Sequence, residues 1–189
     1  MFIIFSGVSA SGKNTIMQEL CKRNSNIKIL KNSSGTTRPP RESDKDNETY
    51  IFMSNEEFEK GIKENRFFEH ENVHGAYYGI LNSALNEVIE NQQVDYVRDI
   101  DVHGQKKIKD YFSGKCPVLT IFLDAPDEEL VKRLRNRGES DDRIKVRLQR
   151  SKLERDCKGE YDLVIENIDI EKTLSEIERF ISIKKAENK

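Results

Sequence analysis

Cysteine and histidine are scarce in this chain of 189 residues, which contains three of each. The cysteines, Cys21, Cys116 and Cys157, are odd in number and far apart, and none forms a C-x-x-C pair. A disulfide framework or a cysteine-based zinc site is therefore not expected, and the reducing cytoplasm is the expected location. The histidines show no metal-ligand arrangement either, so we expect them to be ordinary polar residues.

The sequence also lacks long apolar runs and an excess of charge of either sign. No apolar segment approaches the roughly 20 residues that cross a bilayer, and the short stretch Met1–Phe5 has no basic flank of the kind that signal peptides carry. Basic residues number 32 and acidic residues 34, which gives a net charge of −2. We therefore expect no membrane partner and no general binding to nucleic acid.

The segment from Gly7 to Thr15 is the most informative part of the chain. Its sequence, GVSASGKNT, fits the phosphate-loop pattern G-x-x-x-x-G-K, with Asn14 where a Ser or Thr usually follows the lysine. An ordinary glycine-and-serine turn is the alternative. The apolar run Phe2–Phe5 before the loop and the helical pattern Ile16–Cys21 after it favour a nucleotide site. In such a site the loop amides surround phosphate and Lys13 reaches the β- and γ-phosphates.

Strand-like runs and helical patterns alternate along most of the chain. The expected strands cover Phe2–Phe5, Val94–Ile100, Val118–Leu123 and Asp162–Ile165. The helical patterns that follow them cover about Lys13–Arg23, Val102–Tyr111, Asp127–Arg135 and Ile170–Ile183. This rhythm predicts an α/β fold in which a parallel sheet lies between two layers of helices.

Two segments break the rhythm. Residues 34–80 contain short strand patterns at Tyr50–Met53, Phe67–His70 and Tyr77–Ile80, with Gly75 in a turn and Ser54 and Glu57 in a capping box. The proline-bounded stretch Ser33–Arg41 before them predicts an irregular polar loop. The charged residues 136–158 predict a helical excursion. We expect one domain, 1–189, with a core of 1–33, 81–135 and 159–189, a mixed α+β insert of 34–80 and a lid of 136–158.

The insert begins with a motif suited to phosphate. Arg38 and Arg41 lie three residues apart in a rigid loop, and two guanidinium groups that converge on one phosphate would bind it through charge-assisted, bidentate contacts. Two unrelated surface arginines are the alternative reading of the same pair. Because a phosphate loop occurs elsewhere in the chain, we favour the phosphate site.

Taken with several further motifs, these features show that the chain resembles the guanylate kinases of the nucleoside-monophosphate kinase group. The shared motifs run in order from residue 2 to about residue 169. After the phosphate loop they are the S-x-T-T-R-x-P-R segment from Ser34, E-x-Y-x-F around Tyr50, F-x-E at Glu69, GAYYG from Gly75, DID from Asp99 and RLRNRG from Arg133.

The resemblance implies phosphoryl transfer from ATP to GMP, and to dGMP, with Mg²⁺ as cofactor and ATP and GMP as binding partners. It leaves open whether the chain is a monomer or a homodimer. The implied ATP-binding residues are Gly7, Ser9, Ala10, Ser11, Gly12, Lys13, Asn14, Thr15 and Asn167. The implied GMP-binding residues are Ser34, Arg38, Arg41, Tyr50, Glu69, Tyr78, Gly79, Asp99 and Asp101. The implied catalytic residues are Lys13, Arg41, Arg133, Arg137 and Arg147.

Chemistry supports several of these implied roles. A carboxylate at Glu69 can accept from both N1–H and the 2-amino group of guanine, a pair of donors that adenine lacks. Asp99 and Asp101 alternate at the end of an expected strand, so we expect both to point toward one site. Asn14 and, through water, Asp101 are the implied metal contacts. The arginines would neutralise charge on the transferred group.

Four residues depart from the family pattern. Asn14 replaces a hydroxyl that ligates Mg²⁺, but a carboxamide oxygen is also a hard ligand. Ile80 replaces a hydroxyl that helps to read the guanine carbonyl, which leaves Glu69 as the main reader of the base. Arg98 occupies an apolar strand position, where Asp95 or the Asp99–Asp101 pair could offset its charge. His103 replaces a glutamine.

Two other functions fit parts of the pattern. The chain could be a phosphotransferase of the same fold with another acceptor, an interpretation that Ile80 favours and the set around Glu69 disfavours. It could also be an inactive kinase-like module that binds phosphorylated peptides. The intact Gly12-Lys13 pair and the lid arginines argue against that second alternative.

Overall fold

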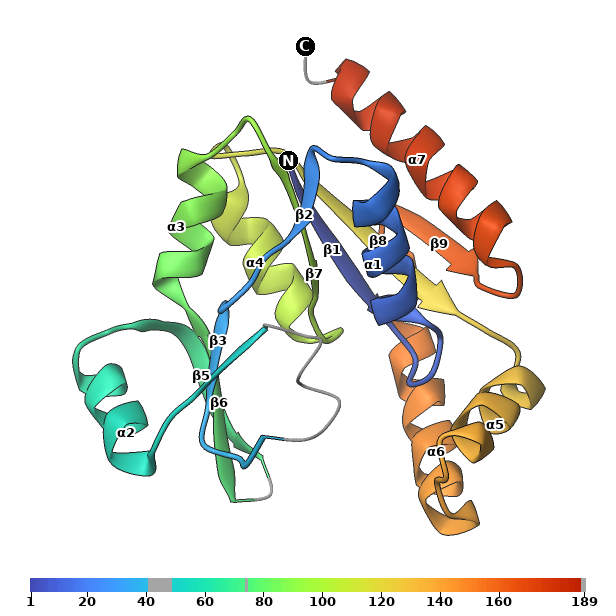
Figure 1. The fold of residues 1–189 in the computed structure, drawn as a ribbon, viewed down its shortest axis with the longest axis horizontal. Helices are drawn as coiled ribbons and strands as arrows, with labels where there is room; N and C mark the ends of the chain where they lie inside the picture. The colour runs from blue at the N-terminus through green and yellow to red at the C-terminus, as the bar shows by residue number, and fades with distance from the viewer. Residues whose placement is uncertain (41–48, 74, 188–189) are drawn as a thin grey trace. The chain divides into compact units, whose positions relative to one another are not determined.

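The computed structural model describes residues 1–40, 49–73 and 75–187. It divides into two compact units. Unit 1 comprises Met1–Ile29 and Val94–Lys189, and unit 2 comprises Leu30–Gln93. Figure 1 shows the elements of both units, and each unit is described by itself below. No helix among the described residues is long and apolar enough to span a membrane.

Unit 1 contains a parallel five-stranded sheet. In sheet order its strands are β2 (Ile27–Ile29), β7 (Asp95–Asp99), β1 (Phe2–Gly7), β8 (Val118–Asp124) and β9 (Leu163–Glu166). β1 is the central strand, and its five residues from Phe2 to Ser6 are buried on both faces, as the continuous apolar pattern predicts for a parallel sheet. The predicted α/β class with a parallel sheet is confirmed.

Helices cover both faces of this sheet (Figure 1). On one face, α1 (Lys13–Arg23) and α7 (Ile170–Glu187) bury Ile16, Leu20, Leu174 and Ile177 against alternate strand residues such as Ile121. On the other face lies α4 (Gly104–Phe112), where the Phe112 ring packs 5.1 Å from that of Phe2. The sheet therefore lies between two helical layers, and the loops at the carboxyl ends of its strands remain available for a site.

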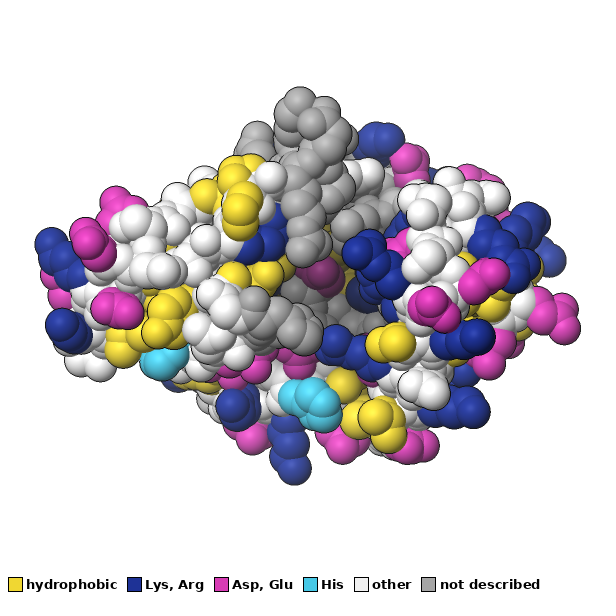
Figure 2. All heavy atoms as spheres, turned by 90° about the horizontal axis from the view of Figure 1, so that it is seen from below, with side chains coloured by type: hydrophobic (Ala, Val, Ile, Leu, Met, Phe, Trp, Pro, Cys, Tyr) yellow, Lys and Arg dark blue, Asp and Glu magenta, His cyan; other side chains and the backbone are white. Residues whose placement is uncertain are grey.

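Two further helices of unit 1 follow β8. These are α5 (Asp127–Asn136) and α6 (Asp141–Asp156), after which the short 3₁₀ helix η2 (Lys158–Glu160) leads into β9. Leu130, Leu134 and Ile144 from these helices pack with Phe122 of β8 in a second apolar cluster. Basic and acidic side chains intermingle on the exposed side of α5 and α6 (Figure 2). The predicted helical excursion of 136–158 is thus observed.

Asp124, at the end of β8, binds side chains from α6 and η2. Its carboxylate accepts from Arg155 Nε at 2.9 and 3.1 Å and from the Ala125 amide at 2.8 Å, and Lys158 Nζ lies 2.6 Å from Oδ2. Burial alone would raise the pKa of Asp124, but the bonds from Arg155 and Lys158 outweigh that effect and lower it. A carboxylate at the end of β8 therefore holds both the end of α6 and η2.

Unit 2 contains a four-stranded mixed sheet. In sheet order its strands are β4 (Tyr50–Phe52), β3 (Ser34–Thr36), β6 (Ala76–Leu81) and β5 (Phe67–Val73), and its helices are α2 (Asn55–Lys63) and α3 (Asn82–Glu90). β3 pairs in parallel with β4 and antiparallel with β6, which pairs antiparallel with β5. α2 begins with the predicted capping box, in which Ser54 and Glu57 each bind the other's backbone amide.

One face of the unit 2 sheet packs against α2 through aromatic rings. The Phe58 ring stacks on Phe67 at 4.2 Å and on Tyr77 at 5.1 Å. Gly35 and Gly79 pair across β3 and β6 on this face. An added Cβ would approach the Phe67 ring to 2.9 Å at Gly35 and 2.7 Å at Gly79, so only glycine leaves room for that ring. The aromatic layer and α2 therefore occupy one face of this sheet.

Two sequence expectations are corrected by the fold. The stretch Ser33–Arg41 was expected to be irregular, but Ser34–Thr36 forms a strand because it is paired on both sides, by β4 and β6. Asp101 was expected to continue the strand that contains Asp99, but β7 ends at Asp99. The Asp101 Oδ1 atom instead accepts from the amides of His103 and Gly104 at 2.8 and 2.9 Å, where α4 begins.

The Asp124 contacts give a prediction about stability. Asp124→Asn removes the negative charge that two partly buried cations share, and we expect the free energy of unfolding to fall by about 1–3 kcal/mol at pH 7. Because the folded-state pKa of Asp124 is lowered, its contribution is present above the ordinary aspartate pKa of about 3.9 and is lost as the pH falls through the folded value.

Urea unfolding of wild type and variant at several pH values measures this effect. The difference between the two proteins should be constant near neutrality and should shrink below about pH 4. Asp127→Asn is the control, because Asp127 also contacts Arg155, at 2.7 Å, but is exposed, so its loss should have little effect. An equal difference at pH 7 and pH 3 would contradict the assignment.

Candidate functional site

The phosphate loop joins the central strand β1 to α1 in unit 1. Its backbone enters the left-handed region three times, at Gly7 (φ 136°), Ala10 (φ 66°) and Gly12 (φ 97°). Glycine suits such angles, whereas Ala10 is a non-glycine residue in a costly conformation of the kind that concentrates at functional sites. An added Cβ at Gly12 would also lie 2.5 Å from Asn167 Nδ2. Both the angle and the close approach therefore require glycine at residue 12.

The loop leaves a run of backbone amides unused. In the part of the chain that the structure describes, the N–H groups of Ser9, Ala10 and Gly12 to Thr15 donate to no protein acceptor. The last three of these residues also form the first turn of α1, whose positive end adds to the attraction for an anion. Consecutive free amides at a helix start form a binding site for phosphate oxygens.

The carbonyl groups of the loop, in contrast, have donors. Arg133 Nη1 lies 3.3 Å from the oxygens of both Ala10 and Ser11, and Asn167 Nδ2 donates to the Ser11 oxygen at 2.8 Å. Lys13 Nζ donates to the oxygens of Gly7 and Val8 at 2.8 and 3.1 Å. Of the amides in the same peptides, those of Ser9 and Gly12 are left for a ligand, whereas Val8 donates to the Leu123 oxygen and Ser11 to the Val8 oxygen.

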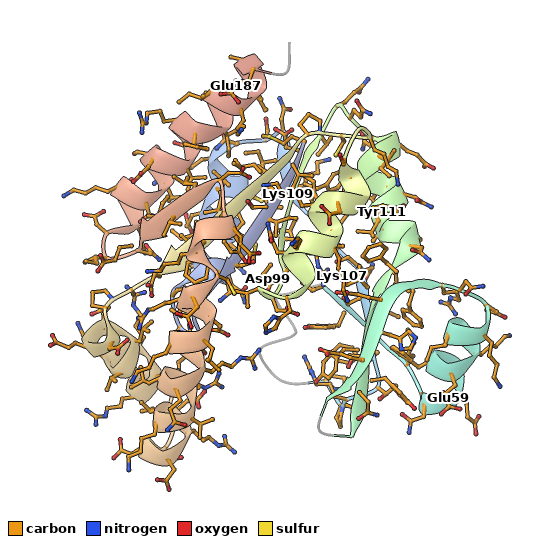
Figure 3. All side chains as sticks on the ribbon, turned by 180° about the vertical axis from the view of Figure 1, so that it is seen from behind. Glu59, Asp99, Lys107, Lys109, Tyr111 and Glu187 are labelled. Atoms are coloured by element: carbon orange, nitrogen blue, oxygen red, sulfur yellow. The ribbon has the colours of Figure 1, made fainter. Side chains whose placement is uncertain are left out.

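Several charged side chains act on the Lys13 ammonium group. Burial lowers the pKa of Lys13, while the carboxylates of Asp99 and Glu154 act in the opposite direction and the cations Arg137 and Arg150 lower it further. Asp99 stands at the carboxyl end of β7 (Figure 3). These charged groups therefore gather around the lysine at the end of the sheet where α/β proteins bind ligands.

The predicted catalytic arginines Arg133, Arg137 and Arg147 differ in their contacts. Arg147 lies between Glu139, which binds it with two oxygens at 3.1 and 2.8 Å, and Ser9 of the loop, whose hydroxyl accepts at 2.8 Å. The exposed Arg137 side chain has no hydrogen bond or ion pair among the described residues, although its charge acts on Lys13. The contacts of Arg147 are only partly buried, and Arg137 has no hydrogen bond or ion pair with a described residue to lose, so both cations remain available to an anionic ligand.

Arg133 and Asn167 have roles that the sequence did not suggest. All three guanidinium nitrogens of Arg133 are used, by Glu129, by the loop carbonyls and by the Asn167 oxygen at 2.8 Å. Asn167 was expected near the adenine base, but it is only 3% exposed and its side chain binds Ser11 and Thr173. Both residues support the loop from outside in this structure, whereas the sequence suggested direct contact with the nucleotide.

Arg150 and Glu154 were not predicted at all. They form an i, i+4 pair on α6 at 3.0 Å, and both act electrostatically on Lys13. The Glu154 Oε2 atom is buried and has no hydrogen-bond partner in the described chain. The only signal in the sequence was their spacing, which also occurs in ordinary helix-surface ion pairs.

The predicted acceptor residues of unit 2 share one face of its sheet. Strand register places Tyr50, Ser34, Ile80 and Glu69 in one row across all four strands. Paired residues point to the same side of a sheet, so these side chains lie on the face opposite the aromatic layer. Tyr78 belongs to the next row on this face, and its ring meets that of Tyr50 edge-on at 6.3 Å.

Arg38 extends this polar face. Its guanidinium carbon lies 5.0 Å from the ring centroid of Tyr50 and 5.3 Å from that of Phe52, and its Nη1 donates to the Pro39 oxygen. These ring contacts hold the cation beside Tyr50. Arg41 lies outside the described residues. Gly79 is on the aromatic side, where its lack of a side chain serves packing.

The departures from the family pattern can also be located. Asn14 is exposed on the first turn of α1, and its carboxamide forms no hydrogen bond with a described residue. Ile80 is the direct cross-strand neighbour of Glu69. Asp95 was considered as a partner for buried Arg98, but it lies 3.1 Å from the Met1 ammonium and 2.5 Å from Lys185. The exposed His103 donates its backbone amide to Asp101.

A loop of free amides after the central strand, with a lysine at its end and arginines from the next helices beside it, is the machinery of the P-loop kinases that act on small phosphate acceptors. Unit 2 adds a polar sheet face that carries Glu69, and comparison with known proteins gives the family. The guanylate kinase family profile matches residues 1–184, so the chain belongs to the guanylate kinase family.

Comparison with individual proteins supports the same family. The chain is 39% identical to a guanylate kinase of Prochlorococcus marinus subsp. pastoris over 181 residues, which cover 95% of each protein. It is 35% identical to a guanylate kinase of Rickettsia felis over 183 residues, 96% of this chain and 92% of that one. Among solved structures, the guanylate kinase from Anaplasma phagocytophilum matches with a TM-score of 0.72 and 27% identity, over 97% of this chain and 85% of the other.

The loop geometry predicts the effect of Gly12→Ala. The new methyl group would need an unfavourable φ of +97° and would contact Asn167 Nδ2, so we expect ATP to bind at least about tenfold more weakly. Isothermal titration with Mg-ATP measures this. Gly159→Ala is the matched control, because nothing lies within 4 Å of its added Cβ. Equal ATP affinity in both variants would rule out the described loop as the ATP site.

Proposed function

We propose that this chain transfers the γ-phosphoryl group of ATP to GMP or dGMP and releases ADP and the guanosine diphosphate. The observation that carries the proposal is that the family membership comes with two separate sets of binding groups. Unit 1 has the loop of unused amides with Lys13, and unit 2 has a polar sheet face with a carboxylate. One set suits the triphosphate donor and the other a guanine monophosphate.

The donor half of the mechanism rests on the loop. Its free amides and Lys13 bind the β- and γ-phosphates of ATP, and the lysine exchanges the carbonyls of Gly7 and Val8 for phosphate oxygens. Arg137 and Arg147 supply positive charge where the phosphoryl group moves. Because this transfer needs little covalent chemistry, positioning and charge neutralisation provide most of the catalysis.

The acceptor half rests on the face of unit 2. Arg38, Tyr50, Tyr78 and Ser34 have the donors that a monophosphate requires, and we propose that Arg41 adds a second guanidinium. Glu69 accepts from N1–H and the 2-amino group of guanine. Asp99, beside Lys13, helps to orient the acceptor. Asp101 has one oxygen committed to the start of α4, so only its other oxygen could contribute.

The residues present fit a magnesium ion brought in with ATP. Mg²⁺ takes most of its six oxygen ligands from phosphates and water and needs only one or two from protein. The Asn14 carboxamide is exposed and uncommitted, and Asp99 lies near Lys13. We propose that Asn14 contacts the metal directly and that Asp101 does so through water. When bound, Mg²⁺ supplies positive charge that neutralises the phosphate oxygens.

The free thiols fit the cytoplasm as the place of this reaction.

A coupled assay of ADP release tests the proposed activity. We compare GMP, dGMP, AMP, UMP and CMP as acceptors, with Mg²⁺ and then Mn²⁺ as the metal. GMP should exceed the non-guanine acceptors in kcat/KM by at least about 100-fold. The Glu69 carboxylate would pair with two donors of guanine, and a base that lacks these donors leaves the carboxylate unpaired. Lys13→Ala, prepared identically, should lose turnover by about 100-fold or more and so excludes a contaminating kinase.

Two results would contradict the proposal. If AMP, UMP or CMP were phosphorylated faster than GMP, the acceptor would have been misidentified. If GMP bound but Mg-ATP neither bound nor reacted, the chain would be an inactive binding module of the same fold.

The position of Ile80 gives a separate prediction about base recognition. Ile80→Thr places a hydroxyl beside Glu69, where it can donate to the guanine carbonyl, and one added neutral hydrogen bond is expected to favour guanine by about two- to tenfold. The measurement is the ratio of kcat/KM for GMP to that for 2,6-diaminopurine riboside monophosphate, which carries an amino group in place of that carbonyl and has no N1–H. The missing N1–H affects wild type and variants alike, so the change in the ratio reports on residue 80.

Ile80→Val is the control for this ratio, because valine has the shape of threonine without the hydroxyl. Its ratio should equal that of the wild type. If Ile80→Thr left the ratio unchanged, or if valine raised it equally, residue 80 would not face the guanine carbonyl.

A further inference from the structure

Thr173 and Asn167 are among the most buried polar residues of unit 1. They are 2% and 3% exposed, and neither lies in the phosphate loop or in the α5–α6 segment. Asn167 follows β9, and Thr173 is on the first turn of α7. The Thr173 hydroxyl donates to Asn167 Oδ1 at 3.0 Å. Since buried hydroxyl and amide groups are costly to leave unpaired, this bond determines how the carboxamide is oriented.

The orientation of Asn167 matters because of what its other atoms hold. With Oδ1 turned to Thr173, Nδ2 faces the loop and donates to the Ser11 oxygen at 2.8 Å. The Asn167 backbone oxygen accepts from Arg133 at 2.8 Å, and its amide donates to the Asp124 oxygen at 2.8 Å. Each polar group of Asn167 is thus used inside the protein.

The Ser11 carbonyl is the point where this network meets the phosphate loop. It accepts from Asn167 and lies 3.3 Å from Arg133 Nη1, and it belongs to the same peptide as the unused Gly12 amide. A peptide is planar, so a carbonyl held outward keeps its amide pointing inward. Rotation of the Asn167 carboxamide would remove the shorter of the two bonds to this carbonyl, so the peptide would be held less firmly in this direction.

We propose that Thr173 is a positioning residue for ATP binding, which acts through Asn167 to keep the Ser11–Gly12 peptide turned so that its amide faces the phosphates. The inference rests on the proposed use of this loop for ATP. Thr173 touches no substrate, and its effect is confined to the donor nucleotide. The described residues to which the mechanism assigns GMP, on the sheet of unit 2 and at Asp99 and Asp101, form no hydrogen bond with Thr173 or Asn167, so GMP binding is independent of it.

Thr173→Val tests the proposal, since it keeps the shape of the side chain and removes the hydroxyl. We expect KM for ATP to rise by about five- to tenfold and KM for GMP to change by less than about twofold. Thr173→Ser retains the hydroxyl and should restore KM for ATP to within about twofold of the wild type.

Thr120→Val is the matched control for loss of stability. Thr120 is also fully buried, and its hydroxyl donates to Asp162 Oδ2 at 2.7 Å, but it lies on β8 opposite Ile4, and its side chain forms no hydrogen bond with a described residue of the phosphate loop. Thr120→Val should lower the melting temperature and leave KM for ATP unchanged. A role of Thr173 in stability alone would make the two valine variants behave alike.

Three outcomes would overturn the inference. The first is an unchanged KM for ATP in Thr173→Val, the second is an equal rise in Thr120→Val, and the third is a Thr173→Ser variant that resembles Thr173→Val. The serine variant keeps the test decisive if the valine variant does not fold, because a fivefold rise in its KM for ATP also contradicts the proposal. Failure of the wild type to phosphorylate GMP would instead refute the proposed function.

Discussion

The rest of the donor site depends on the direction in which the phosphate-loop peptides point. A loop that offers its amides to an anion must turn its carbonyls away, and those carbonyls need donors of their own. Here the donors come from far along the chain, from Arg133 on α5 and from Asn167 after β9, and from Lys13 itself. The phosphate loop is therefore a local motif whose shape is completed by the last third of the sequence.

Paired charges explain how so many arginines coexist around one lysine. Arg147 is held by Glu139, Arg150 by Glu154 and Arg133 by Glu129, so most of the positive charge is balanced before any nucleotide binds. Each pair is partly buried, with Glu139 and Glu154 less exposed than their arginines, so the carboxylates hold these cations in place beside the loop. In the proposed reaction a phosphate oxygen replaces Glu139 as the partner of Arg147, while Arg133 keeps its contacts with the loop.

The sequence predicted the features that depend on local pattern. The strand, loop and helix from Phe2 to Arg23 follow from apolar periodicity and glycine spacing, and the capping box at Ser54 follows from residue type. Strand β3 could not be predicted, because its pairing partners, not its own residues, make Ser34–Thr36 extended. The contact of Asn167 with Ser11 spans 156 positions and leaves no periodic trace in the sequence.

The direct test of the donor site is a two-dimensional ¹H–¹⁵N NMR titration of the wild-type protein with Mg-ATP. Phosphate oxygens that accept from the unused amides should shift the resonances of Gly12, Lys13 and Asn14 downfield, as hydrogen bonds to charged acceptors do. The amide of Val8, already bonded to the Leu123 oxygen, should move least in the loop. Saturation with ATP without any shift at Gly12 to Asn14 would contradict the account.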